Sequence, residues 1–222
     1  PLNAILGFAQ ILELGKKSPL PDKQKNQVRE IRKGGEHLIK LIDQILDLAK
    51  VESENLRLSI EVVDARELVN DCLSIAESLA ATRGISIEDR TGDAVPTIWV
   101  DHLRSKQAIL NLLSNAVKYN RNGGQVWQDA ERHEETYRIS VTDTGLGIPE
   151  DRQSELFMPF SRLEAENSDI QGTGIGLSLT KKLMDEMGGT VGFMSTLGEG
   201  STFWVEMPFA EEGVQTVITE AN

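Results

Sequence analysis

Cysteine and long apolar runs are nearly missing from this sequence of 222 residues. A single cysteine, Cys72, excludes an internal disulfide and a metal site built from several cysteines, and it suits a reducing compartment. Cys72 lies at an apolar spacing of a helix, so we expect it to be packed in a core. No apolar run approaches the roughly 18–20 residues of a membrane span, and the N-terminus lacks the basic-then-apolar order of a signal peptide. A cytoplasmic location is expected, with any membrane anchor of the parent protein elsewhere.

Basic charge is also in deficit, with 23 Lys+Arg against 35 Asp+Glu and a formal net charge of -12. Docking on nucleic acid or on an anionic membrane needs a basic face, so both kinds of partner are disfavoured. An anionic ligand would need a pocket that is basic locally.

The first quarter of the chain has helical periodicity. Apolar residues recur at spacings of three and four over residues 2–14, a segment with two prolines breaks the pattern at 18–22, and a second helix is predicted over 23–53. Its heptad-like seam contains Val28, Ile31, Leu38, Ile42 and Ile45. The sequence therefore predicts an antiparallel helical hairpin whose apolar stripe is half covered. Either two copies form a four-helix bundle, or the hairpin packs on its own domain.

Shorter alternating elements follow, so we predict a domain boundary near residue 56. Helices are expected over residues 65–82, 102–119 and 174–187, and strands over 56–63, 85–89, 97–100, 125–128, 137–142, 190–195 and 201–208. This order predicts an α+β sandwich with helices on one face of a mixed sheet. The predicted organisation is a hairpin at 1–55, a sandwich domain at 56–210 and a mobile acidic tail at 211–222.

Polar residues share one face of the helix predicted over 102–119. Asn111 and Asn115 are four apart and Lys118 follows three later, whereas the opposite face is apolar. Asparagine is unfavourable within a helix, so a ligand face is one interpretation, with oxygen ligands for Mg²⁺ and an ammonium group for phosphate. An ordinary solvated face is the other.

The segment after the strand at 137–142 combines Asp143 with Gly145 and Gly147. Glycines two apart let the backbone turn closely around a ligand, and an Asp at a strand end can accept a hydrogen bond from the amino group of a base. A plain turn is the alternative. Calcium is disfavoured, because the loop contains only one acidic residue.

Gly172, Thr173, Gly174 and Gly176 open the helix predicted over 174–187. The N–H groups and the positive dipole end of such a helix suit phosphate. This segment does not follow a strand and lacks the Lys-Ser/Thr pair of a P-loop, which disfavours both the dinucleotide fold and the P-loop fold. Before it lie a Phe-x-x-Phe segment at 157–160 and a polar stretch at 164–171, which we interpret as a lid.

The order of these motifs is more specific than any one of them. Asn-x₃-Asn-x₂-Lys-Tyr, Asp-x-Gly-x-Gly-Ile, Phe-x-x-Phe and Gly-Thr-Gly-Ile-Gly-Leu resemble the N, G1, F and G2 boxes of the histidine-kinase branch of the GHKL (Bergerat-fold) ATPases. The hairpin resembles the dimerisation and phosphotransfer domain of these kinases. Its first residues, 1–5, resemble the end of the motif His-Glu-Leu-Arg-Thr-Pro-Leu-Asn, so the acceptor histidine is expected just before Pro1.

The resemblance implies roles for individual residues. Asn115 would be the Mg²⁺ ligand, Asp143 would bind adenine, and Lys118 would point toward the phosphates of ATP. The other residues that would border or contact the nucleotide are Asn111, Tyr119, Gly145, Gly147, Arg162, Gly172, Thr173, Gly174, Gly176 and Thr202; Arg162 would reach the γ-phosphate and Thr202 would lie near the base. His37, His102 and His133 are expected to be structural or solvated.

The resemblance also implies an activity and partners. The chain would be the core of a sensor histidine kinase, an enzyme that transfers the γ-phosphoryl of Mg-ATP to a histidine and then to an Asp of a response regulator receiver domain. Its partners would be a second copy, that receiver domain and an upstream sensor domain. The alternatives are a non-catalytic dimerising pseudokinase and another GHKL ATPase.

Overall fold

The computed structural model describes residues 1–15, 19–52, 56–92, 95–133, 135–161 and 172–210. The predicted acidic tail at 211–222 lies outside the described residues. The chain divides into two compact units, Pro1–Glu54 and Asn55–Asn222. Within the described ranges, no helix is long and apolar enough to cross a bilayer.

The first unit is the predicted helical hairpin, formed by α1 (Leu2–Leu14) and α2 (Asp22–Glu52). Ala9 of α1 and Val28 of α2 are both buried in this unit. Gly35 of α2 lies against α1, because a Cβ at this position would come within 2.6 Å of Leu6 Cδ2. The absence of a side chain at Gly35 therefore leaves room for the Leu6 side chain between the two helices.

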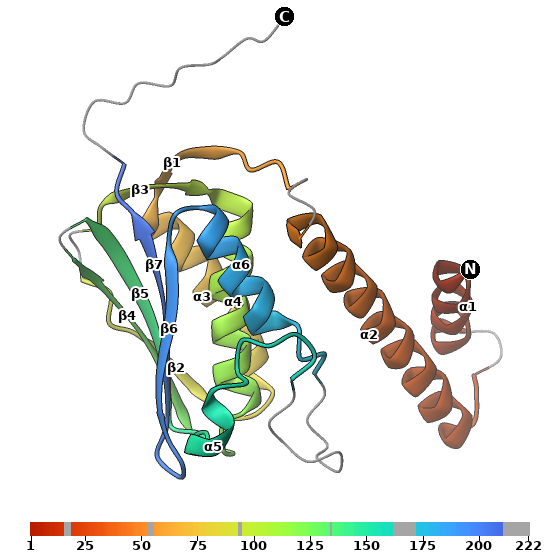
Figure 1. Cartoon of the computed structure of the whole chain (residues 1–222). Coiled ribbons are helices and arrows are strands. Elements are labelled where there is room, and N and C mark those ends of the chain that lie inside the picture. The colour runs from red at the N-terminus through yellow and green to blue at the C-terminus, as the bar shows by residue number, and fades with distance from the viewer. Residues whose placement is uncertain (16–18, 53–55, 93–94, 134, 162–171, 211–222) are drawn as a thin grey trace, which may run out of the picture. The chain divides into compact units, whose positions relative to one another are not determined.

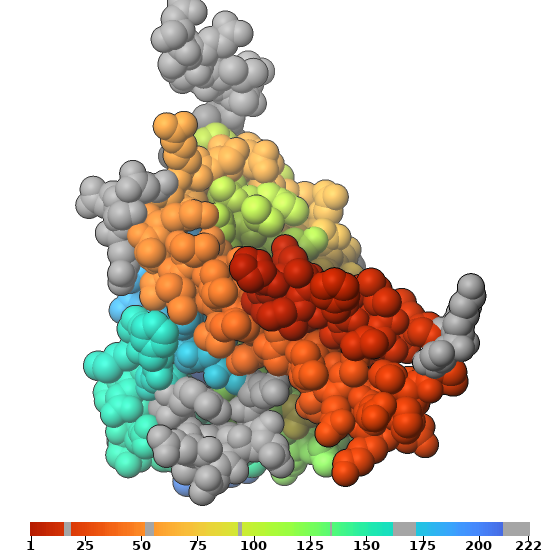
Figure 2. Space-filling model, turned by 90° about the vertical axis from the view of Figure 1, so that its right-hand side faces the viewer, coloured from red at the N-terminus to blue at the C-terminus, as the bar shows by residue number. Residues whose placement is uncertain are grey.

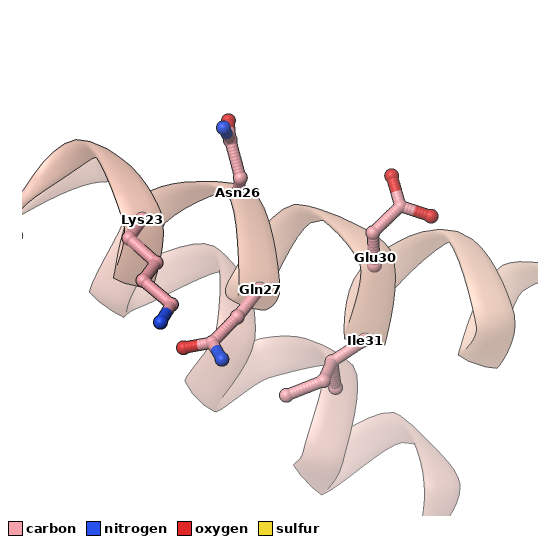
Figure 3. A pocket seen from close by; sticks show the side chains of 5 residues that line it. All are labelled: Lys23, Asn26, Gln27, Glu30 and Ile31. Atoms are coloured by element: carbon pink, nitrogen blue, oxygen red, sulfur yellow. The ribbon is translucent and has the colours of Figure 1, made fainter.

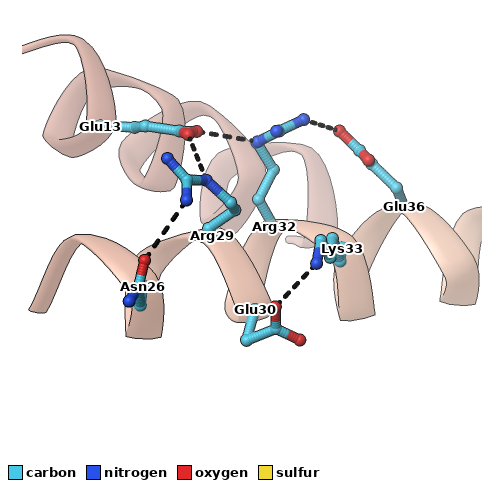
Figure 4. A network of polar contacts seen from close by, with 7 residues as sticks. All are labelled: Glu13, Asn26, Arg29, Glu30, Arg32, Lys33 and Glu36. Atoms are coloured by element: carbon cyan, nitrogen blue, oxygen red, sulfur yellow. Dashed lines mark hydrogen bonds and ion pairs between the residues drawn. The ribbon is translucent and has the colours of Figure 1, made fainter. Parts of the chain in front are cut away.

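A network of polar contacts also joins the two helices (Figure 4). Glu13 of α1 accepts hydrogen bonds from Arg29 Nε at 3.2 Å and Arg32 Nε at 3.0 Å of α2. The hydrogen bond from Arg29 is the main reason that the pKa of Glu13 lies below its ordinary value. Because the two arginines lie on one side of α2, the shared carboxylate favours one register of the hairpin.

A shallow groove lies along the beginning of α2, and Figure 3 shows the five residues that line it. They are Lys23, Asn26, Gln27, Glu30 and Ile31, all exposed residues of one helix. Small-molecule sites are usually clefts or cavities that enclose most of their ligand. This groove is open to solvent and lined by side chains of a single helix, so we place the candidate site in the second unit.

The second unit contains a five-stranded sheet in the order β2-β4-β5-β7-β6. Its strands are β2 (Ser86–Asp89), β4 (Gln125–Arg132), β5 (Thr136–Asp143), β6 (Thr190–Thr196) and β7 (Gly200–Pro208). Strand β2 is parallel to β4, and the other pairs are antiparallel. A separate antiparallel pair joins β1 (Ile60–Asp64) to β3 (Thr97–Asp101).

Figure 1 shows α3 (Ala65–Ala81), α4 (His102–Lys118) and α6 (Gly176–Glu186) on one face of this sheet. The predicted α+β sandwich is thereby confirmed. On the central strand β5, the residues facing the helices are buried and alternate with more exposed ones, as a sheet with one covered face requires. Tyr137, Ile139 and Val141 belong to this core, and Asp143 continues the same alternation at the strand end.

The prediction and the structure differ mainly at element ends. Strand β4 continues to Arg132, where Asp129, Glu131 and Arg132 interrupt the apolar alternation on which the prediction relied. The ladder with β5 supplies the hydrogen bonds that extend it. Helix α5 (Glu150–Gln153) was not predicted, because a single turn has too few residues for a periodic pattern. Cys72 is fully buried as expected, and burial raises its pKa to about 12.

Candidate functional site

Helix α4 presents the predicted polar face. Asp101 caps this helix by accepting a hydrogen bond from the Arg104 N–H at 3.0 Å. Asn111, Asn115 and Lys118 are partly exposed, whereas the helix positions between them are mostly buried in the core. Burial of the apolar side thus fixes the rotation of α4 about its axis. The face that carries Asn111, Asn115 and Lys118 points away from the core.

The glycine segment before α6 lies directly against this face. A Cβ at Gly172 would overlap Lys118 Nζ, and a Cβ at Gly176 would overlap Asn111 Oδ1. The Asn111 amide also donates a hydrogen bond to Thr180 Oγ1 of α6 at 2.9 Å. A side chain at either glycine would displace the Lys118 ammonium or the Asn111 amide, so glycine at both positions preserves this close contact.

Lys118 and Tyr119 form one unit at the end of α4. Lys118 Nζ donates a hydrogen bond to the Tyr119 hydroxyl at 2.8 Å and lies 4.3 Å from the centre of the Tyr119 ring. The pair holds a positive charge beside Gly172. In a chain with a net charge of -12, this is the locally basic position that an anionic ligand requires.

Asp143 occupies the end of β5, and its side chain is only 7% exposed. Its Oδ1 accepts a hydrogen bond from the Gly145 N–H at 2.7 Å, and the Ser201 N–H is a second backbone donor. Burial raises the pKa of Asp143 to about 6, and these two donors reduce the shift. A carboxylate has about four lone-pair positions, so Asp143 can still accept a hydrogen bond from a ligand.

The loop after Asp143 passes between α4 and the β6–β7 turn. The Leu146 N–H donates to the Tyr119 carbonyl at 3.3 Å. Gly147 has a φ of +65°, and a Cβ there would overlap the Thr196 carbonyl. Only glycine can combine that left-handed conformation with such close contact. The Asp143 motif is thus built into the packing between the two neighbouring segments.

Thr202, which the resemblance places near the base, is not on the strand face of Asp143. In the β5–β7 ladder Asp143 pairs with Ser201, whereas Thr202 pairs with Thr142. Successive side chains alternate between the faces of a strand, so Thr202 is on the opposite face. There its Oγ1 lies 3.0 Å from Thr142 Oγ1. The residue that shares the face of Asp143 is Ser201.

The Phe-x-x-Phe segment joins the site to the sheet edge. The Phe157 ring lies 5.9 Å from the Phe193 ring, and the Phe193 ring lies 5.7 Å from the Phe203 ring. Phe160 is 61% exposed and has a φ of 63°, which is unusual for a bulky residue. Residues around 150–160 appear in teal at the surface in Figure 2. Arg162 and the predicted lid at 164–171 lie outside the described residues.

The three histidines belong to different segments of the chain. His37 belongs to α2, His102 begins α4, and His133 Nε2 lies 3.1 Å from Glu131 Oε1. Among the residues that the structure describes, no group of three or more His, Cys, Asp or Glu side chains is arranged to hold a metal ion. A cation at this site would therefore need amide oxygens and ligand oxygens.

Taken together, the fold and the site define an α/β sandwich with a buried carboxylate, an Asn-Asn-Lys helix face and a glycine segment, preceded by a helical hairpin. Residues 100–211 match the family of histidine kinase-, DNA gyrase B- and HSP90-like ATPases, and residues 1–54 match the His Kinase A (phospho-acceptor) domain. The chain belongs to the histidine kinase-, DNA gyrase B- and HSP90-like ATPase family, with a His Kinase A domain ahead of the ATPase domain.

Similar proteins agree with this assignment. The sensor histidine kinase GacS of Pseudomonas protegens is 38% identical over 215 residues, which cover 93% of this chain and 23% of GacS. The non-motile and phage-resistance protein of Caulobacter vibrioides is 36% identical, with 94% of this chain and 25% of that protein covered. Full-length ShkA in complex with AMPPNP has a TM-score of 0.78 and 34% identity, covering 95% of this chain and 43% of ShkA. The chain thus spans about a quarter of these two curated relatives.

Proposed function

We propose that this chain is the catalytic core of a sensor histidine kinase, which binds Mg-ATP in the second unit and transfers the γ-phosphoryl to a histidine. The observation that supports this most strongly is the contact between the glycine segment and the α4 face. Gly172 and Gly176 lie against Lys118 and Asn111 so closely that a Cβ would overlap them. The similarity to ShkA, which was solved with AMPPNP, supports a nucleotide as the ligand.

The residues fit the two ends of ATP. Asp143 is a buried acceptor with unused lone pairs, which suits the exocyclic amino group of adenine. Ser201 shares its face, so we propose Ser201 rather than Thr202 as the polar neighbour of the base. Gly145 and Gly147 shape the loop beside it. Tyr119, which is hydrogen bonded to Lys118, would border the nucleotide.

The phosphates of ATP would lie between α4 and the first turn of α6. Lys118 supplies a positive charge there, and the N-terminal N–H groups of α6 follow the segment of Gly172, Thr173, Gly174 and Gly176. Asn115 offers an amide oxygen of the kind that Mg²⁺ accepts. ATP supplies the phosphoryl group, and the protein contributes positioning and charge neutralisation, to which Asn111, Lys118 and Arg162 would belong.

The hairpin supports a second copy as partner. Four residues of the predicted seam, Ile31, Leu38, Ile42 and Ile45, are 44–54% exposed in the single chain. Joining two hairpins in a four-helix bundle would cover this stripe. A response regulator receiver domain would take the phosphoryl group, a sensor domain would supply the input, and the location would be cytoplasmic; these three proposals rest on the resemblance to sensor histidine kinases.

The metal role of Asn115 can be tested by the Asn115→Asp variant. A carboxylate at this position repels the phosphates of ATP unless Mg²⁺ lies between them. We expect the ratio of ATP affinity with Mg²⁺ to that without Mg²⁺ to rise by at least about threefold. Titration calorimetry with and without Mg²⁺ measures it, and Asn70→Asp, at an exposed position of α3, is the control.

The same titrations test the proposed function. The unmodified chain should bind ATP, and bind it more tightly with Mg²⁺. If it binds no ATP in either condition, the proposed function is wrong. If it binds ATP while Asn115→Asp and Asn70→Asp behave alike, Asn115 is not the metal ligand.

A further inference from the structure

Ser195 of β6 lies where the sheet meets the loop that follows Asp143. The Ile148 N–H donates a hydrogen bond to Ser195 Oγ at 2.9 Å. Ser195 Oγ also lies 2.8 Å from Ser201 Oγ and donates to the Gly200 carbonyl at 3.1 Å. One hydroxyl therefore contacts the end of the Asp143 loop, the β6–β7 turn and the residue that faces Asp143.

These contacts use the full capacity of a hydroxyl, which is one donor and two acceptor lone pairs. Ser195 Oγ accepts from the Ile148 N–H, and its own proton can go to the Gly200 carbonyl or to the Ser201 hydroxyl. An alanine would leave the Ile148 N–H without this acceptor and the Ser201 hydroxyl without this partner. A partly buried group that loses its partner is destabilising, so the loop would shift or open.

Gln153 makes a second connection between the same segments. Its Nε2 donates to the Ile148 carbonyl at 3.1 Å and to the Ser195 carbonyl at 3.2 Å. Gln153 belongs to α5, which follows the loop directly and lies near the β6–β7 turn in Figure 1. The Gly198 N–H adds a bond to the Leu146 carbonyl at 2.7 Å. The outer side of the loop is thus tied to one turn of the sheet.

The inner side of the loop is tied to the end of α4. Asn120 is 4% exposed, and its Oδ1 accepts a hydrogen bond from Thr144 Oγ1 at 3.3 Å. The Leu146 N–H donates to the Tyr119 carbonyl at 3.3 Å. Because α4 carries the Asn-Asn-Lys face, these bonds set the distance from that face to Asp143. The contacts of Ser195 hold the loop from the other side.

We propose that Ser195 is a positioning residue for nucleotide binding: its hydroxyl holds the loop of residues 144–148 in the conformation that leaves Asp143 open to the base. Gln153 supports the same conformation through the Ile148 carbonyl. This inference rests on the proposed function, because it takes the adenine ring of ATP as the ligand of Asp143. Ser195 itself touches no reacting atom.

The test compares Ser195→Ala with Ser195→Thr and with Ser140→Ala in the full chain. Thr keeps the hydroxyl and suits a strand, so it should restore the behaviour of the unmodified protein. Ser140 is on the outer face of β5, away from Asp143, and serves as the matched control. Calorimetry gives the affinity for Mg-ATP, and hydrogen exchange gives the protection of the Ile148 amide without nucleotide.

We expect Ser195→Ala to weaken Mg-ATP binding by about threefold to tenfold and to speed exchange of the Ile148 amide by about tenfold, as the loss of one or two hydrogen bonds implies. Ser195→Thr and Ser140→Ala should change neither value. Equal ATP affinity in Ser195→Ala and the unmodified chain would overturn the inference and leave the proposed function intact. If the unmodified chain binds no ATP, the proposed function fails, and unchanged exchange in Ser195→Ala would separately show that Ser195 does not order the loop.

Discussion

Replacing Asp143 by asparagine should lower the affinity for ATP by about 10- to 100-fold while leaving the fold intact. The carboxylate is the buried side-chain acceptor that we assign to the adenine amino group. Losing a charge-assisted hydrogen bond costs about 1.5–3 kcal/mol, and asparagine can present its NH₂ group to the same donor. The Gly145 N–H keeps an acceptor in the variant, because the asparagine carbonyl oxygen can replace Oδ1.

The same substitution should not destabilise the protein at neutral pH. The pKa of folded Asp143 is about 6, raised from 3.8 by burial. A raised folded pKa means that the protonated carboxyl contributes stability fully below about pH 4, and that this contribution is lost as the pH rises through 6. At pH 7.5 the unmodified chain therefore carries a cost of up to about 3 kcal/mol that Asp143→Asn avoids.

ATP affinity should depend on pH in the opposite direction from the stability of the fold. The ionised carboxylate is the better acceptor, so affinity should fall as the pH drops through about 6, and Asp143→Asn should lack this component. The phosphates of ATP titrate equally with the unmodified chain and with Asp143→Asn. The difference between the two pH profiles of ATP affinity therefore isolates the contribution of Asp143. Calorimetry from pH 5 to 8 measures the ATP affinity, and chemical denaturation measures the stability.

Asp129→Asn is the control, because Asp129 is on the opposite face of the sheet. Equal ATP affinity in Asp143→Asn and the unmodified chain would refute the adenine assignment.

Replacing Ile42 and Ile45 by lysine should convert a dimer into monomers. Both residues are 44% exposed in the single chain, so lysine can reach water there and the hairpin should still fold. In a four-helix bundle the same positions would be covered, and two copies would bury four lysines without partners. Burying unpaired charge costs several kcal/mol, which exceeds what the remaining seam can offset.

Light scattering at micromolar concentration measures the mass of each variant. The control combines Asn26→Lys with Asp43→Lys at exposed polar positions of α2, which adds more positive charge than the test variant. We expect the control to remain dimeric and the Ile42/Ile45 variant to be monomeric with unchanged helix content. An unmodified chain that is already monomeric at this concentration would contradict the proposed bundle.

The fold was largely predictable because its signals are local. Leu112, Leu113, Ala116 and Val117 repeat at helical spacing, and this pattern alone oriented the Asn111, Asn115 and Lys118 face of α4. The sequence could not tell which of Ser201 and Thr202 shares a strand face with Asp143, because the face of a strand residue depends on its register with the neighbouring strand. A shift of one residue moves a side chain to the other face, and the motif Gly-Ser-Thr-Phe does not reveal the pairing of Ser201 with Asp143.

The residues that hold the loop after Asp143 were not predictable for a related reason. Ser195 and Gln153 are 42 residues apart in the sequence, and each resembles an ordinary polar residue in its own segment. Only the tertiary contacts reveal that both bind the same end of one loop, at Ile148. The single signal was the glycine content of residues 196–200, which indicates a tight turn but not what the turn contacts.

The most direct test of the histidine-kinase assignment is phosphoryl transfer from γ-labelled ATP. The residues His-Glu-Leu-Arg-Thr are added before Pro1 to complete the motif that residues 1–5 resemble, and the control carries glutamine in place of the added histidine. We predict an acid-labile label on the extended chain, and none on the control or on the 222-residue chain, whose three histidines lie outside that motif. An extended chain that binds Mg-ATP and stays unlabelled, or an acid-stable label on the 222-residue chain, would contradict the account.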